Sequence, residues 1–256
     1  MIAIISDIHA NYDALKAVLA EIDRLGAESI ICLGDIVGYG PQPIACVDEV
    51  RARCEVTVCG NHDAALIYGA DDFNAVARSS LDYHRHLLMP RPDGGGDMEK
   101  RRERWEFLKK LRRRYVQDER LFVHGSPRNP VAEYLRKIDV LLGLRDKIGG
   151  NFQEIDWLCF IGHTHRPGVI TQDMRFLDPG QLDGVYEPEY RRKAIINVGS
   201  VGQPRDGDWR ACFATVDENN LVRYHRVEYD VDATAEKVAA TPGIDHSLAE
   251  RLRQGK

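Results

Sequence analysis

Aspartate and histidine stand two residues apart at the end of the first apolar run of the chain, as Asp7 and His9, and two histidines repeat this spacing at His163 and His165. In an extended segment, side chains two positions apart point to the same side. Each pair can therefore converge on one ion or on two neighbouring ions. Carboxylate and imidazole groups in this arrangement indicate a metal site.

Three further apolar runs also end in residues that bind metals. Asp35 follows the second run, Asn61 and His62 follow the third, and His124 follows a later one. Five of the nine histidines lie at the ends of such runs, so their clustering is the signal. Asp35 is suited to bridge two cations because each carboxylate oxygen can bind one. The donors include no thiolate, which favours Mn, Fe, Zn or Co over a structural all-cysteine zinc site.

Each motif taken alone also fits an ordinary loop. An Asp-x-His sequence is common in turns, Gly60-Asn61-His62-Asp63 also fits a plain Asn-containing loop, and Gly162-His163-Thr164-His165 fits a solvated hairpin. Short motifs match by chance at a high rate. Five of them in succession, each directly after an apolar run, favour a metal site.

The apolar runs are the strands that must position these side chains. A buried strand that ends in a turn delivers the next side chain to the carboxyl edge of a sheet, where open α/β sheets place their ligands. Between the first two runs, the apolar spacing over Leu15–Leu25 predicts an amphipathic helix that Gly26 ends. A second helix is expected after Pro43. Strand, loop and helix therefore alternate, which indicates an α/β fold.

The alternation lapses between residues 64 and 118. This stretch contains a Pro/Gly-rich break at 90–96 and then a strongly basic segment from Glu99 to Tyr115, predicted to be helical. We interpret 64–118 as a helical basic insertion. Its charges fit either a solvated helix face above an apolar stripe or a cap that attracts an anionic substrate.

Strands are predicted again from Arg120 to Glu228. The tail from Thr234 to Arg253 is predicted to form one or two surface helices, broken at Pro242. The 256 residues suit a single domain, 1–256.

Composition and charge narrow the class of protein. Hydrophobic residues make up 43% and charged residues 29% of the chain, as in soluble globular proteins. The net charge of −5 argues against a dedicated nucleic-acid binder. No apolar stretch reaches the roughly 18 residues of a membrane span, and Met1 leads directly into a strand, which leaves no room for a signal peptide. We expect a cytoplasmic protein without a membrane or stable nucleic-acid partner, with six free cysteines, and the oligomeric state stays open.

Taken in order, these motifs resemble those of the calcineurin-like metallophosphoesterase superfamily over roughly residues 1–210. The segments 34–41, 124–127 and 197–205 more closely resemble bacterial phosphodiesterases grouped with asymmetric diadenosine tetraphosphate hydrolases. The resemblance implies a four-layer αββα sandwich of two mixed sheets flanked by helices.

The resemblance also implies two divalent metal ions, Mn or Fe before Zn or Co, in two ligand sets that share one carboxylate. The first set is Asp7, His9, Asp35 and His165, and the second is Asp35, Asn61, His124 and His163. His62 would lie outside both sets and donate a proton or hydrogen bond to the leaving-group oxygen, and Asp63 would orient the His62 ring.

The expected function is hydrolysis of a phosphodiester or phosphoanhydride of a small nucleotide, such as a dinucleoside polyphosphate or a cyclic nucleotide, by a metal-bridging hydroxide. Arg205 is expected to contact the substrate, although its loop also fits an exposed turn with a local ion pair. Ser200, Gln203 and Tyr39 are further candidates. A serine/threonine protein phosphatase or a nuclease would use the same centre. A non-catalytic scaffold would lack a ligand or His62, and this sequence has all of them.

Overall fold

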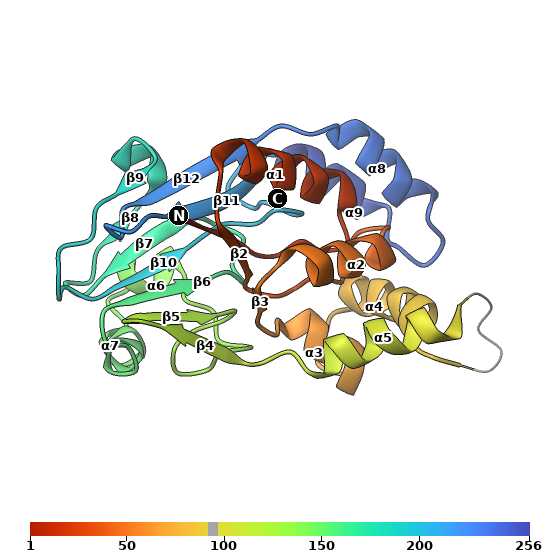
Figure 1. The fold of residues 1–256 in the computed structure, drawn as a ribbon, viewed down its shortest axis with the longest axis horizontal. Coiled ribbons are helices and arrows are strands. Elements are labelled where there is room, and N and C mark those ends of the chain that lie inside the picture. Colours follow the sequence, from red (N-terminus) through yellow and green to blue (C-terminus); the bar gives the residue numbers. More distant parts are fainter. Residues whose placement is uncertain (92–96) are drawn as a thin grey trace.

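The apolar runs form two six-stranded sheets that lie face to face (Figure 1). The computed structural model describes residues 1–91 and 97–256. The first sheet has the order β3-β2-β1-β11-β12-β9, built from β1 (Ile2–Ile5), β2 (Ser29–Cys32), β3 (Val56–Thr57), β9 (Val185–Tyr186), β11 (Ala211–Val216) and β12 (Val222–Val227). The second has the order β4-β5-β6-β10-β7-β8, built from β4 (Arg114–Gln117), β5 (Arg120–Val123), β6 (Leu158–Ile161), β7 (Gly168–Thr171), β8 (Phe176–Leu177) and β10 (Ala194–Asn197).

Both sheets are mixed. In the first sheet β1, β2 and β3 run parallel, and β11 joins β1 antiparallel. In the second sheet β5, β6 and β10 run parallel, and β4 and β7 join them antiparallel. The parallel strands at the centre of each sheet therefore bring their carboxyl ends to one edge.

Helices cover the outer faces of both sheets. Those described are α1 (Tyr12–Leu25), α2 (Pro43–Arg53), α3 (Asn61–Tyr68), α4 (Ala75–Leu88), α5 (Met98–Lys109), α6 (Lys137–Leu141), α7 (Arg145–Gln153), α8 (Val231–Ala240) and α9 (Ser247–Gln254), with a 3-10 turn at Pro179–Leu182. In Figure 1, α1 lies above the first sheet and α7 below the second.

Alternating side chains explain the four layers. On β1, Ile4 packs between the two sheets, whereas Ala3 and Ile5 pack toward α1 and α2. On β6, Phe160 packs between the sheets and Ile161 packs toward α6 and α7. Strands that are covered on both faces are apolar at every position, which is why they were recognisable as continuous runs. The predicted αββα sandwich of two mixed sheets is confirmed.

The helix predicted from Glu99 to Tyr115 is wrong at its C-terminal end. Helix α5 ends at Lys109, and Arg114–Gln117 forms the edge strand β4 beside β5. Tyr115 pairs with Phe122 across the two strands and packs between the sheets, so burial of its ring outweighs continuation of the helix. The break predicted at 90–96 lies outside the described residues from residue 92 onward.

Helix α5 packs against α2, α3 and α4. Its Arg104 pairs with Asp48 of α2 at 2.6 Å. The predicted helices of the tail are present as α8 and α9. All six cysteines are free thiols, and five of them are buried. No described helix combines the length and the apolar character that a membrane crossing requires.

Candidate metal centre

All seven predicted metal ligands converge at the carboxyl ends of the central strands. Those that follow strands of the first sheet are Asp7, His9, Asp35 and Asn61, and those that follow strands of the second are His124, His163 and His165. Except for Asn61, their exposed fractions lie between 0 and 3%. The site therefore lies where the two sheets meet, and its side chains are almost fully buried.

The backbone at five of these residues adopts a conformation that is uncommon for residues other than glycine. The φ angles of Asp7, His9, Asp35, His163 and His165 lie between 48° and 65°. Contacts of the Cβ atom disfavour the left-handed backbone conformation, and residues that nevertheless adopt it are concentrated at functional sites. Here it turns consecutive polar side chains inward from the ends of three strands.

The donor atoms fall into two groups that share Asp35. In the first group, His165 Nε2 lies 3.1 Å from His9 Nε2 and 3.2 Å from Asp7 Oδ1, and His9 Nε2 lies 3.7 Å from Asp35 Oδ2. These are the four residues of the first expected ligand set.

The second group is centred on His124. Its Nε2 lies 3.3 Å from Asp35 Oδ2, 3.1 Å from Asn61 Oδ1 and 3.1 Å from His163 Nδ1. These are the four residues of the second expected set. A third cluster joins His62 to His9 and Asp35, so His62 also borders the site.

Each of the four histidines predicted to be ligands has its other ring nitrogen against a main-chain carbonyl. The pairs are His9 Nδ1 with Val37 at 3.0 Å, His124 Nδ1 with Leu33 at 2.9 Å, His163 Nε2 with Ala132 at 3.2 Å, and His165 Nδ1 with Gln203 at 2.6 Å. A carbonyl oxygen can only accept, so each of these ring nitrogens donates. In the neutral ring, the nitrogen that faces the site then carries a lone pair.

The site therefore brings together carboxylate oxygens and histidine nitrogens that can accept hydrogen bonds, and some of them have no donor to bond with. Asp7 Oδ1 is buried without a hydrogen-bond partner, and its near neighbours are the lone pairs of His9 and His165. Asp7, Asp35 and Asp63 are at most 1% exposed, and burying carboxylates in this way is costly unless cations accompany them. Imidazole, carboxylate and amide donors in this arrangement fit divalent metal ions.

Asp35 lies at the centre of the electrostatic network. Burial opposes ionisation of this carboxyl, but the neighbouring His124 and His62 hold its pKa well below the usual range. Burial lowers and the Asp35 carboxylate raises the pKa of His124, which rises to about 9. The first turn of α3 adds a hydrogen bond from His62 N to Asp35 Oδ1 at 2.8 Å. The centre therefore favours positive charge beside Asp35.

The ring of His62 is enclosed by aromatic groups. Ring centroids of His9, Tyr39 and Phe73 lie 4.7 to 4.9 Å from that of His62. Burial lowers the pKa of His62 to about 4. Its Nδ1 is buried without a hydrogen-bond partner, beside Gly38.

Asp63 does not orient the His62 ring, which corrects the sequence expectation. Its Oδ2 accepts hydrogen bonds from the backbone N–H groups of Asp35 and Gly60, at 2.8 and 3.0 Å, and its Oδ1 accepts from Ile36 at 2.9 Å. Asp63 is the third residue of α3, and its carboxylate satisfies the helix N-terminus instead. It thereby positions the loop that carries Asp35.

Ser200 and Gln203 also have roles other than the expected substrate contact. Ser200 is fully buried, and its hydroxyl donates to Asp7 O at 2.8 Å and accepts from Gln203 N at 2.8 Å. Gln203 presents its main-chain oxygen to His165 and its side-chain oxygen to Arg205 at 2.7 Å. Both residues hold the metal-centre loops in place.

Several contacts at the site could not be assigned from sequence motifs. Tyr134 stacks on His163 with ring centroids 3.6 Å apart. Helix α4 reaches the Tyr39 loop, since Ser80 Oγ accepts from Tyr39 N at 2.9 Å and His84 Nδ1 accepts from Gly38 N at 3.0 Å. Ser80 and His84 are four residues apart on the apolar face of α4. Polar residues at these positions of an apolar face were the one sequence feature that could have indicated a contact with the site.

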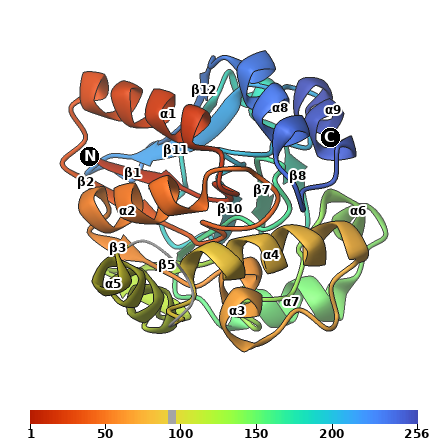
Figure 2. The same ribbon diagram turned by 90° about the vertical axis from the view of Figure 1, so that its right-hand side faces the viewer.

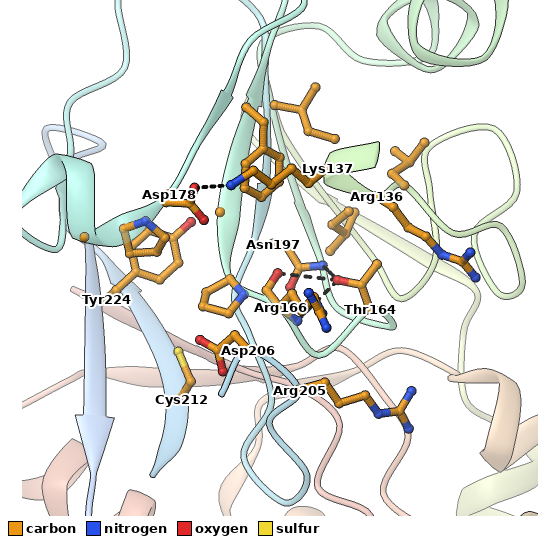
Figure 3. Close-up of a pocket in the computed structure, with 18 of the residues that line it drawn as sticks. Arg136, Lys137, Thr164, Arg166, Asp178, Asn197, Arg205, Asp206, Cys212 and Tyr224 are labelled. Carbon is orange, nitrogen blue, oxygen red and sulfur yellow. Dashed lines mark hydrogen bonds and ion pairs between the residues drawn. The ribbon is translucent and has the colours of Figure 1, made fainter. Parts of the chain in front are cut away.

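A cavity of about 830 Å³ opens beside the loop that carries His163 and His165 (Figure 3). Thr164 from that loop and Arg205 both line it, together with the basic side chains of Arg136 and Arg166. Figure 3 shows Arg205 at the margin of this cavity, with its guanidinium pointing away from Asp206 and Cys212. A volume of this size suits a small organic ligand.

Comparison with known proteins finds a family over most of the chain. The sequence model described as the calcineurin-like phosphoesterase superfamily domain matches residues 1–220. An uncharacterised protein of Methanocaldococcus jannaschii is 33% identical over 264 residues, which covers 100% of this chain and 98% of that protein.

Solved structures agree. A metallophosphoesterase from Sphaerobacter thermophilus is 37% identical, with a TM-score of 0.78 over 100% of this chain and 98% of that one. A hypothetical protein from Pyrococcus horikoshii OT3 has the same fold, with a TM-score of 0.75 at 21% identity over 100% of this chain and 99% of that one.

Proposed function

Since the chain belongs to the calcineurin-like phosphoesterase superfamily, we propose that it hydrolyses a phosphodiester or phosphoanhydride bond in a small nucleotide, using two divalent metal ions. It is a phosphoric ester hydrolase of this family. The observation that carries the proposal is the pair of four-residue donor groups that share Asp35, in which ring nitrogens 3.1 Å apart face one another.

Residues Asp7, His9, Asp35 and His165 would hold one ion, and Asp35, Asn61, His124 and His163 the other. Divalent ions bound there would activate water and neutralise phosphate charge. The neutral His62 ring lies beside Asp35 and can donate a hydrogen bond to the departing oxygen, and its protonated form could donate a proton. The Phe73 ring packs edge-on against His62, with ring centroids 4.9 Å apart.

The cavity beside the centre supports a small substrate. Arg205 lines this cavity and is also attached to the loop that carries His165, since Arg205 N donates to His165 O at 3.1 Å. A phosphate at the metals would therefore lie near a guanidinium, and the organic part of the ester can occupy the cavity. Protein phosphatases and nucleases use the same kind of centre, so the substrate class must be determined by comparing the hydrolysis of different substrates.

The test supplies purified protein with Mn, Fe, Zn or Co in turn and measures hydrolysis of dinucleoside polyphosphates, cyclic nucleotides, phosphopeptides and single-stranded DNA. We expect turnover of a nucleotide in at least one metal condition. Preference for the phosphopeptide or for DNA would replace the proposed substrate class. Protein that binds two ions but hydrolyses none of these, nor bis-p-nitrophenyl phosphate, would instead be a non-catalytic scaffold.

A further inference from the structure

Tyr39 lies near both the metal centre and two arginines that come from distant parts of the chain. Its ring neighbours His9 and His62 of the centre, with centroids 4.7 Å away in both cases. The guanidinium carbons of Arg205 and Arg251 lie 5.6 and 6.0 Å from the same ring. Arg251 belongs to α9, which lies with α8 on the side of the molecule shown in Figure 2.

Neither arginine forms an ion pair with an aspartate or glutamate side chain in the part of the chain that the structure describes. Arg205 Nη2 donates to the amide oxygen of Gln203, and its Nε is buried without a partner. Arg251 Nε donates to the oxygen of Lys256, the last residue of the sequence, at 3.1 Å, and no hydrogen-bond partner of its other two guanidinium nitrogens is described. Burial and the charge of Arg205 both lower the pKa of Arg251, so the two cations lie close enough to repel each other.

Nearby arginines are arranged differently. Arg253, two positions along α9, pairs with Asp232 at 2.6 Å. Arg210 pairs with Asp208 at 2.6 Å, and Arg226 pairs with Asp206. A lack of acidic residues in this region therefore does not explain why neither Arg205 nor Arg251 pairs with an acidic side chain.

The fold holds these two like charges together. The apolar face of α9, including Leu248 and Leu252, packs against the partly buried Tyr39. The main chain of Arg205 is bonded to His165. The main chains of both arginines are therefore anchored beside the metal centre, so that an anion bound between the guanidinium groups would relieve their repulsion.

We propose that Arg205 and Arg251 form an anion site that binds a second phosphate group of the substrate while the first occupies the metal centre. This rests on the proposed function, which places the reacting phosphate at the metals. The planar guanidinium group donates paired hydrogen bonds that match phosphate oxygens. The site selects substrates with two or more linked phosphates over cyclic nucleotides, which carry one.

The experiment measures binding of pyrophosphate and orthophosphate by calorimetry to protein loaded with Mn, with Mn in excess over the ligand. Arg251→Met should lower the ratio of pyrophosphate to orthophosphate affinity by about tenfold, since a hydrogen bond between charged groups is lost. Arg251→Lys should restore part of the ratio. Arg253→Met is the matched control on the same helix and should leave both affinities unchanged.

An unchanged ratio in Arg251→Met, or an equal loss for both ligands, would overturn the anion site. Hydrolysis of bis-p-nitrophenyl phosphate by the wild type is measured separately. If the wild type fails to hydrolyse any ester but its pyrophosphate affinity depends on Arg251, the proposed function fails and the anion site stands. If hydrolysis is present and the ratio does not depend on Arg251, only the anion site fails.

Discussion

His62 occupies a position that differs from those of the four ligand histidines. Each of those rings has one nitrogen fixed against a main-chain carbonyl, and this fixes the tautomer and leaves a lone pair for the site. The His62 Nδ1 has no such partner in the described structure. Its ring is held by aromatic neighbours instead of by hydrogen bonds. A ring without a fixed tautomer can present an N–H group to a substrate oxygen, which fits the hydrogen-bonding role proposed for His62.

We therefore predict that His62→Ala keeps both metal ions and lowers kcat by about 10² to 10⁴, the range for a lost general acid. Metal content is measured by mass spectrometry and kcat with a substrate whose leaving group is poor. His86→Ala, an exposed histidine of α4, is the control and should retain the wild-type rate. Loss of a metal ion from His62→Ala would instead assign His62 as a ligand.

At the scale of single residues, the convergence of the proposed metal ligands was predictable from the sequence, and the contacts of the residues around them were not. Each ligand follows a buried strand, so the position alone brings it to the common edge. Asp63 follows His62 directly, yet its carboxylate bonds the N–H groups of the Asp35 loop because it is the third residue of α3. That role depends on where the helix begins relative to a loop about thirty residues earlier, which no local pattern specifies.

Glycines at the ends of strands let the metal-centre loops approach one another. A Cβ at Gly162, at the end of β6, would lie 2.0 Å from Ser6 Oγ and 2.5 Å from Asp7 Oδ2. Gly162 O also accepts a hydrogen bond from Asn197 Nδ2 at 2.5 Å, so β10 holds the same turn. The close contact between β1 and β6 therefore requires glycine here.

Gly162→Ala should destabilise the protein by about 1 to 3 kcal/mol, as overpacking does, and should weaken metal binding because the methyl group displaces Asp7. Denaturant unfolding and metal content measure the two effects. Gly149→Ala is the matched control: it lies within α7 with no atom within 4 Å of the added methyl group, and should stabilise by up to about 1 kcal/mol. Equal effects of the two substitutions would contradict the close approach of the loops.

Helix α4 supports the loop that carries Tyr39 through a buried histidine. His84 Nδ1 accepts from Gly38 N, and its Nε2 donates to Gly40 O at 2.7 Å. Only the neutral ring can make both bonds. Burial lowers the pKa of His84 to about 4, compared with about 6.5 for an unperturbed histidine.

This pKa predicts the direction of the pH dependence. The unfolded chain binds a proton at His84 as the pH falls through 6.5, whereas the folded protein does so near 4. The His84 contribution to stability is therefore full above pH 6.5 and is lost as the pH falls toward 4, by about 3 kcal/mol. His84→Asn retains an acceptor for Gly38 but does not titrate.

The unfolding free energy of wild type should thus exceed that of His84→Asn at pH 7, by about 1 kcal/mol for the lost bond to Gly40, and this difference should shrink or reverse by pH 4.5. Urea titrations of both proteins at several pH values measure it. A constant difference over this range would show that His84 does not titrate in the way its burial requires.

At the scale of elements, long apolar or amphipathic segments were predictable and short strands were not. Helix α1 and the central strands follow their hydrophobic patterns closely. Strands β8 and β9 have two residues each, too few for a period to appear. Strand β4 exposes Arg114 and Val116 and forms because β5 offers an edge, so only the tertiary structure distinguishes it from the end of α5.

Across the whole molecule, the metal centre joins the two sheets. Each of the two donor groups contains residues from both, with Asp35 from the first sheet in common. Direct protein contacts across this junction include the hydrogen bond from His163 N to Asp7 Oδ2 at 3.0 Å. Hydrogen bonds from His124 Nδ1 to Leu33 O at 2.9 Å and from Ser200 Oγ to Asp7 O at 2.8 Å also cross it, and ions bound by the two donor groups would add to the attraction between the sheets at this edge.

Removal of metal should therefore lower the stability of the folded molecule as a whole. An ion present at about 100 times its Kd contributes about 2.7 kcal/mol, so two ions contribute about 5 kcal/mol. For a chain of this size that corresponds to a fall in Tm of about 10 to 20 °C. Calorimetry with Mn and after chelation measures the shift.

The Tm of Asp35→Ala, which removes the carboxylate common to both groups, should be insensitive to chelation, and this variant should not bind two ions. If the wild-type Tm were unchanged by chelation, or if Asp35→Ala retained the Mn-dependent shift, then the ions would not join the two sheets through Asp35.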